Sequence, residues 1–202
     1  MIARLIRNLL PTVAVLFLTA SSQAQTNKIG TIDLGDVFTN YWKTIQANIE
    51  VKERADEVTR TRQKMLDDYQ TAQEEYQQLL ERVNDEAISS SERERRKTAA
   101  ERKLAEVKDI EESVRVYSQT SNDNLANLQM RRRDAILAEI REVIDARAKA
   151  GGYSLVIDSA ALTVDRTHVI LYTNRQNDLT REVLSNLNLT APPGFLEEHA
   201  NR

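Results

Sequence analysis

The chain has 202 residues, of which 29% are charged and 5% aromatic, with five glycines, three prolines and no cysteine. This composition argues against an ordinary globular domain and favours long helices, and the lack of cysteine excludes disulfides and thiolate metal sites. The formal net charge of −3 argues against nucleic acid as a partner.

Residues 1–24 have the pattern of a signal peptide. Arg4 and Arg7 supply positive charge, 9–20 is apolar, and Ser22-Gln23-Ala24 offers the small residues that a signal peptidase needs. The alternative is an uncleaved membrane anchor, but the apolar run is short for a membrane span. We therefore predict an exported mature chain, with 26 basic against 31 acidic residues and a formal charge of −5.

The first segment after the signal peptide predicts a small strand and helix. Residues 28–32 are rich in β-branched side chains and are predicted to form a strand. Asp33 follows as the expected N-cap of a helix. One face of that helix should pack back on the strand, and it consists of Val37, Phe38 and Tyr41. Trp42, the single tryptophan, is expected to be a packing or interface residue.

A narrow apolar stripe then runs along a charged segment. Apolar residues recur every third or fourth position from Val51 to Val83, with Arg62 as the one interruption, and a second stripe follows further on. A stripe of period 3.5 is typical of a coiled coil. The predicted seam comprises Val51, Val58, Met65, Tyr69, Tyr76, Leu79 and Val83 on the first arm, and Leu104, Val107, Val114, Leu125 and Leu128, ending near Ala135, on the return arm.

The serines between the two stripes predict a reversal of the chain. Ser89 with Glu92, or Ser91 with Glu94, makes a capping box for a second helix, so the first helix should end near Ala87 and the tip should lie at 88–92. An arm of about 45 residues would extend about 65 to 70 Å. The alternative is a straight parallel coiled coil, which would leave the terminal strands far apart. The second stripe shifts near its end to Ile136, Ile140, Val143 and Ile144, where the arm should rejoin the body.

The end of the chain returns to short elements. Gly151 and Gly152 should end the long helix. Two continuous apolar runs, 155–157 and 169–172, are predicted as strands that are covered on both faces and joined as an antiparallel pair. Asn177-Asp178 should cap a last helix, with a face of Leu179, Val183, Leu184 and Leu187. Residues 191–202 are expected to form a flexible tail.

The predicted fold is mainly α with a small β body (α+β), in which 25–42 and 150–190 form the body and 43–149 form a helical hairpin arm. A body of about 60 residues is marginal for a self-sufficient core. A monomer could not cover its strands on both faces, so three strands per subunit should share a core in an obligate oligomer. The predicted oligomer core comprises Ile29, Ile32, Leu155, Val156, Ile157, Val169, Ile170 and Leu171.

The sequence holds no convincing pattern for chemistry. His168 and His199 have no second histidine or cysteine close by in the sequence, and the five glycines form no phosphate-binding motif. The carboxylates lie among basic neighbours on predicted helices, so spacing singles out no acid/base pair. We therefore expect no enzyme activity, no cofactor and no metal site.

Basic residues gather just past the predicted turn. Six bases stand against two acids between residues 93 and 103. The simple interpretation is a solvated helix face. The functional interpretation is a tip that contacts acidic client segments or anionic lipid head groups. The cluster comprises Arg93, Arg95, Arg96, Lys97, Arg102 and Lys103; a second basic group, Arg131-Arg132-Arg133, lies midway along the return arm.

Two end segments resemble a known family. They are Lys28-Ile29-Gly30-Thr31-Ile32-Asp33 with Val37-Phe38 and Tyr41, and Gly152-Tyr153-Ser154-Leu155-Val156-Ile157-Asp158 with Asp178-Leu179-Thr180 and Val183-Leu184. With the long arms between them, the mature chain resembles the Skp/OmpH family of periplasmic chaperones of outer-membrane proteins.

The resemblance implies a homotrimer with a shared body and three helical hairpins around a cavity. It also implies an ATP-independent holdase that binds unfolded outer-membrane proteins in the periplasm. The best-known members are strongly basic whereas this mature chain is acidic, which directs attention from overall charge to the basic cluster at the tip. The alternative function is a structural spacer or tether of the cell envelope.

Overall fold

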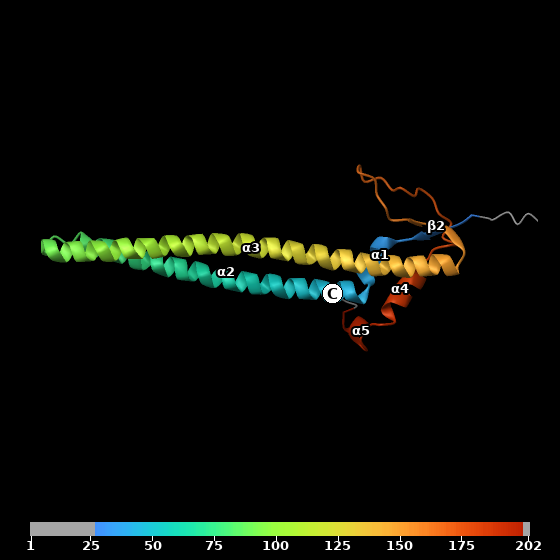
Figure 1. The fold of residues 1–202 in the computed structure, drawn as a ribbon, viewed down its shortest axis with the longest axis horizontal. Helices are drawn as coiled ribbons and strands as arrows, with labels where there is room; N and C mark the ends of the chain where they lie inside the picture. The colour runs from blue at the N-terminus through green and yellow to red at the C-terminus, as the bar shows by residue number, and fades with distance from the viewer. Residues whose placement is uncertain (1–26, 200–202) are drawn as a thin grey trace, which may run out of the picture.

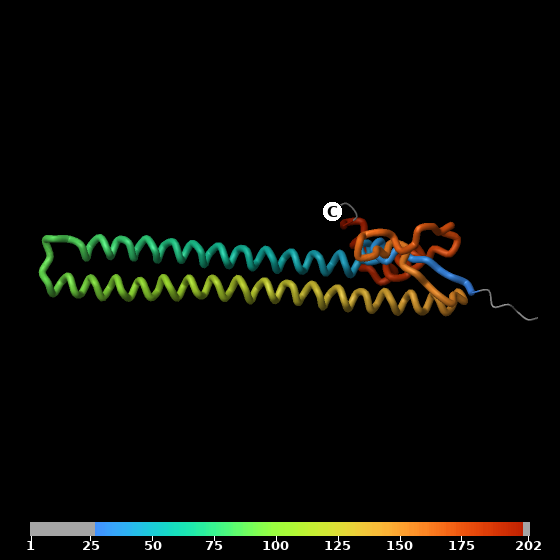
Figure 2. The backbone as a smooth tube through the Cα atoms, turned by 90° about the horizontal axis from the view of Figure 1, so that it is seen from above, coloured from blue at the N-terminus to red at the C-terminus, as the bar shows by residue number. Residues whose placement is uncertain are grey.

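The structure, a computed structural model, describes residues 27–199, so the predicted signal peptide and the last three residues of the predicted tail lie outside it. A two-helix arm projects from a small body at one end (Figures 1 and 2). No helix within 27–199 is both long and apolar enough to cross a membrane. The elements in order are β1 (Lys28–Ile32), α1 (Leu34–Asn40), α2 (Trp42–Val83), α3 (Ser90–Ala150), β2 (Tyr153–Asp158), α4 (Thr180–Asn188) and α5 (Phe195–His199).

The predicted first strand and its helix cap are confirmed. β1 pairs in parallel with β2, so the two ends of the described chain meet in one sheet. Asp33 is extended, and its carboxylate accepts a hydrogen bond of 2.8 Å from the backbone N–H of Asp36, which satisfies an unpaired donor at the start of α1. The chain then turns at Tyr41 into α2.

The prediction of a third strand at 169–172 is wrong for the single chain. An antiparallel connection begins after β2, where the N–H of Val169 donates to the carbonyl of Ala161 at 2.9 Å, but regular pairing goes no further. The other edge of β1 is occupied by 177–179, since the N–H of Thr31 donates to the carbonyl of Asn177 and the carbonyl of Thr31 accepts from the N–H of Leu179. A strand needs a neighbour for its backbone groups, and beyond Val169 the described chain supplies no backbone partner to 170–172.

The hairpin arm and its seam match the sequence. α2 and α3 lie side by side along the whole arm (Figure 2). All twelve predicted seam residues are buried or half-buried, Arg62 is exposed as its charge requires, and Ser121, a polar interruption of the return stripe, is buried. The seam is therefore intramolecular, with α3 covering the apolar stripe of α2.

Two boundaries of the arm differ from the prediction. α2 ends at Val83 rather than near Ala87, so the connection occupies 84–89. Ala135 is exposed, and Ile136 takes over the inward direction one residue later. A helix has 3.6 residues per turn, so an apolar stripe of period 3.5 drifts around its surface. Near Ile136, the packing of α3 also passes from α2 to the body.

The core of the body lies where α3 crosses the ends of the chain. Ile140 and Val37 are fully buried there, as is Val183 of α4, and Ile136 and Tyr41 belong to the same cluster. The predicted stripe shift and the predicted faces of α1 and α4 are confirmed. α3 is therefore one unbroken element that serves as an arm at one end and as core at the other.

The base of the arm also carries a polar contact. Glu139 of α3 accepts hydrogen bonds from the Tyr41 hydroxyl at 2.8 Å and from the Lys43 ammonium at 2.7 Å. Partial burial opposes ionisation of Glu139, but the hydrogen bonds and the charge of Lys43 outweigh it and lower its pKa. Burial, followed by the contact with Glu139, raises the pKa of Tyr41 above its ordinary value of 10.0.

The end of the described chain is not a flexible tail. After α4, the chain forms α5 and returns to the base of the arm, where the Phe195 ring packs edge-on against Trp42 at 6.0 Å between centroids. The expectation for 191–202 is thus wrong for 191–199. Its error has a physical reason, because a polar, Pro-rich sequence such as 190–194 predicts a loop but says nothing about what the following aromatic residue contacts.

Candidate functional site

The turn at the arm tip is fastened by two residues of the predicted basic cluster. Ser89 caps α3, accepting from the N–H of Glu92 at 3.2 Å. The Arg96 guanidinium donates to the carbonyl of Arg82 at 2.9 Å and to the Glu92 carboxylate at 3.0 Å. Arg93 donates to the carbonyl of Val83 at 3.2 Å. These carbonyls end α2 and lack partners within that helix, so both arginines stabilise the turn.

A third member of the cluster joins the two arms. The Lys103 ammonium lies 2.5 Å from the Glu75 carboxylate of α2 and 2.9 Å from Glu106 of its own helix, and its side chain is 17% exposed. Hydrogen bonds to Glu106 and then to Glu75 raise the pKa of Lys103. This lysine belongs to the scaffold.

The other three predicted cluster residues point to solvent. Arg95, Lys97 and Arg102 are exposed, and within the part of the chain described, none has a side-chain ion pair. Arg95 and Arg102 are seven residues apart, so they lie on one face of α3 about 10 Å apart, whereas Lys97 lies on a different face. The structure therefore divides the cluster into three structural cations and three that are free to meet a partner.

The second basic group divides in the same way. Arg132 forms an ion pair of 2.8 Å with Glu50 of α2, across the arm. Arg131 and Arg133 on either side are exposed. The pair with Glu50 is exposed to solvent, so it contributes little stability.

Exposed apolar side chains on the arm are a feature that the sequence analysis missed. Leu66, Val116 and Met130 lie off the seam and are 37%, 46% and 56% exposed. Leu66 also borders a shallow groove between the helices, together with Tyr69 and Val114. Each lies within one or two residues of a seam position, so the stripe pattern hid it. A search for apolar positions outside the seam would have found them.

The predicted oligomer core is mostly open to solvent in the single chain. Ile29, Leu155, Val169 and Leu171 are exposed, and Tyr172 beside them is 86% exposed. Val156, Ile157 and Ile170 are half-buried. Ile32 differs from the rest because it is buried in the core of its own subunit.

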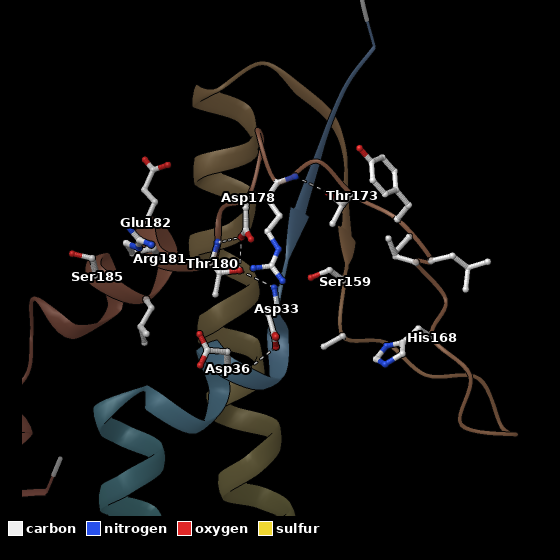
Figure 3. A pocket seen from close by; sticks show the side chains of 16 residues that line it. Asp33, Asp36, Ser159, His168, Thr173, Asp178, Thr180, Arg181, Glu182 and Ser185 are labelled. Atoms are coloured by element: carbon white, nitrogen blue, oxygen red, sulfur yellow. Dashed lines mark hydrogen bonds between the residues drawn. The ribbon is translucent and has the colours of Figure 1, made fainter. Parts of the chain in front are cut away.

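A large open groove lies between the body and the loop that carries the apolar run 169–172 (Figure 3). It measures about 1250 Å³. Asp33 and Thr180 lie on its body side, and His168 lies on the loop across from them (Figure 3). The carboxylate of Asp33 caps α1, and the backbone N–H of Asp33 donates to the Thr180 hydroxyl at 2.8 Å. These polar groups therefore already have partners within the fold.

One histidine, His168, lines the groove. His168 has no side-chain hydrogen bond to any residue of 27–199 that could make it a general base. The described residues contain no group of three or more metal-ligating side chains that could hold an ion. Ile170 and Leu171 on the loop and Leu184 on α4 give the groove an apolar part. Charged side chains also line it, among them Arg175, Asp178 and Arg181.

Comparison with known protein families decides the assignment. The family model described as outer membrane protein (OmpH-like) matches residues 28–187, which covers β1 to α4 and the whole arm. The chain belongs to the OmpH-like family. No curated protein matches it.

OmpH-like proteins are periplasmic chaperones rather than enzymes. Membership therefore supports a general role as a periplasmic chaperone of outer-membrane proteins.

Proposed function

We propose that the protein is an ATP-independent holdase, in which the arms of a trimer enclose an unfolded outer-membrane protein. The observation that carries the proposal is the pairing of a long arm with an open apolar body face in one small chain. α2 has 42 residues, which corresponds to about 63 Å of reach.

The body face supports assembly first. A two-stranded sheet is rarely stable alone, and this one leaves Leu155 in water, as the neighbouring loop leaves Leu171 and Tyr172. Fully burying a leucine or aromatic side chain contributes about 1.5 to 3 kcal/mol, so covering these residues from several subunits supplies a substantial driving force. The number three follows the resemblance to the family.

The arms then provide the client surface. Leu66, Val116 and Met130 are exposed apolar residues on charged helices, which suits many weak contacts with an unfolded chain rather than one tight site. Several arms acting on one client multiply such contacts. At the tip, Arg95 and Arg102 add a local positive face that would attract acidic client segments or an anionic lipid surface.

The test of holdase function is suppression of aggregation. The mature chain, residues 25–202, should slow aggregation when an outer-membrane β-barrel protein is diluted out of urea. The Leu66→Ser/Val116→Ser/Met130→Ser variant should suppress less while keeping its helix content. Failure of the unaltered chain to suppress aggregation would refute the function.

Assembly needs its own measurement and a matched control. Leu171→Glu should reduce the mass measured by light scattering, because it places a charge in the proposed shared core. Leu189→Glu makes the same change at an exposed residue outside that face and should leave the mass unchanged. A folded monomer for the unaltered mature chain would refute the shared body.

The contribution of the tip can be separated from that of net charge. Arg95→Glu/Lys97→Glu/Arg102→Glu should weaken binding of an acidic unfolded client at low salt. The control, Arg60→Glu/Arg62→Glu/Lys64→Glu, makes an equal charge change at exposed positions of α2. Equal weakening by both would contradict a specific role of the tip.

A further inference from the structure

The family match ends at Leu187, but the described chain continues to His199. The additional residues do not extend away from the body. They bring α5 to the base of the arm, beside the start of α2 (Figures 1 and 2). The segment 188–199, called the clasp below, therefore contacts the place where the arm leaves the body.

The clasp begins with a side chain that holds two helix ends. α1 ends at Asn40 and α2 begins at Trp42, with Tyr41 in an extended conformation between them (φ −71°, ψ 127°). The amide of Asn188 donates to the carbonyl of Asn40 at 3.1 Å and accepts from the N–H of Trp42 at 3.0 Å. Helix ends leave such groups unpaired, so one amide satisfies both sides of the corner and fixes their separation.

The rest of the clasp covers the indole of Trp42. The indole N–H donates to the Thr190 hydroxyl at 3.2 Å, and the Phe195 ring meets the indole edge-on. His199 stacks on Phe195 at 4.4 Å between centroids, and its Nδ1 lies 2.7 Å from the Phe195 carbonyl oxygen. Edge-on and offset stacked aromatic pairs are favoured geometries, so the aromatic end of α5 is an organised contact.

We infer that the clasp is a conformational device that fixes the direction of the arm. The arm enters the body at two places: α3 continues directly into the core through Ile136 and Ile140, whereas α2 is joined through the corner at Tyr41. With both attachments in place the arm resists bending in the plane of the two helices. Without the clasp, α2 is held at its base by Tyr41 in the core and by the contacts of Tyr41 and Lys43 with Glu139, so the corner can shift more easily.

The geometry amplifies a small release at the corner. Packed helices are about 10 Å apart, and α2 is about 63 Å long. A slip of about 1 Å of the α2 end along its axis, relative to α3, therefore tilts the arm enough to move its tip by about 6 Å. The inference concerns arm motion and holds whether or not the arms enclose clients.

The chain is well suited to a direct test, because Trp42 is its single tryptophan and it has no cysteine. In the mature chain, Phe195→Ala and truncation after Leu189 should shift Trp42 emission to longer wavelength and increase its quenching by acrylamide. Phe195→Tyr keeps the ring and should behave like the unaltered chain. Leu189→Ala, a change at an exposed neighbour, is the matched control.

Arm direction is measured separately with spin labels. Cysteines introduced at the exposed positions Gln78 on α2 and Ser185 on α4 report the distance between arm and body. Labelled chains are mixed with an excess of unlabelled chains, so that only distances within one chain are seen. The distance distribution should broaden in Phe195→Ala, in the truncation and in Asn188→Ala, and stay narrow in the control.

Two results would overturn the inference. One is Trp42 becoming accessible while the distance distribution stays narrow, because the clasp would then only cover the indole. The other is a truncated chain with unchanged emission and unchanged distances, because the clasp would then not bind the corner in solution. Circular dichroism confirms that each variant keeps its helices.

Discussion

Replacement of Ile140 by alanine tests whether one residue of α3 joins the arm to the body. Ile140 is fully buried among residues of α1 and α4. The substitution removes three carbon atoms, which at about 0.8 kcal/mol per buried methylene costs about 2.4 kcal/mol before any cavity term. Isoleucine-to-alanine changes in cores cost about 2 to 5 kcal/mol in total. We expect about 3 kcal/mol and a fall in Tm of about 6 to 12 °C.

Val116→Ala is the matched control, because Val116 lies on the same helix but is 46% exposed on the arm. Both changes replace a β-branched residue by alanine within α3, so both gain the same helix propensity. The control should change the free energy of unfolding by less than about 1 kcal/mol. The difference between the two variants therefore isolates burial.

The assay is urea unfolding at one chain concentration, since the stability of an oligomer depends on concentration. Circular dichroism follows all helices, and fluorescence of Trp42 follows the base of the arm. Ile140→Ala should move the Trp42 transition to lower urea at least as far as the circular dichroism transition. An equal effect of the two variants, or an unmoved Trp42 transition, would refute the placement of Ile140 in the core.

Four further predictions concern charge and backbone. The stability advantage of the unaltered chain over Glu139→Gln should be full above pH 4.5 and shrink as pH falls, because the pKa of Glu139 is lowered in the folded state. Tyr41→Phe should lessen the loss of stability above pH 10, because the pKa of Tyr41 is raised in the folded state and the unfolded chain therefore releases this proton first. Both are measured as Tm against pH. Arg96→Ala should lower the stability of the arm by about 1 kcal/mol, because hydrogen bonds at the tip are lost. Amide hydrogen exchange near the turn should become faster, and unchanged exchange would contradict this role of Arg96. Gly152→Ala should cost about 1 to 2 kcal/mol in urea unfolding because Gly152 has φ +67°, whereas the control Gly35→Ala, without a positive φ, should cost less.

The sequence predicted those elements whose signals are local. Asp33 was identified as a cap, and Ser89 as one of two candidate caps beside Ser91, because a short polar side chain before a helix can satisfy its first N–H groups in any context. The seam was identified because its spacing repeats over many turns, so single interruptions such as Arg62 did not hide it. For the same reason the shift of the stripe to Ile136 and Ile140 located the base of the arm.

The candidate site was predicted only in part. Composition located the basic cluster correctly, but it could not separate Arg95 and Arg102, which face solvent, from Arg96 and Lys103, which hold the turn and the arms together. Charge in a sequence shows that a side chain is a cation, whereas its partner depends on which carbonyl or carboxylate the fold places within reach.

By itself, the sequence located the two long helices to within a few residues, the hairpin and the parts of the chain that return to one body, because these follow from periodicity and from capping residues. The tertiary structure alone decided which segments of the chain contact one another in the body. It placed 177–179 beside β1, it left 169–172 outside the sheet, and it brought Asn188 and Phe195 back to Trp42. Strand pairing and docking of a short helix depend on residues more than 100 positions apart in the chain, and such contacts leave no periodic signal in the sequence.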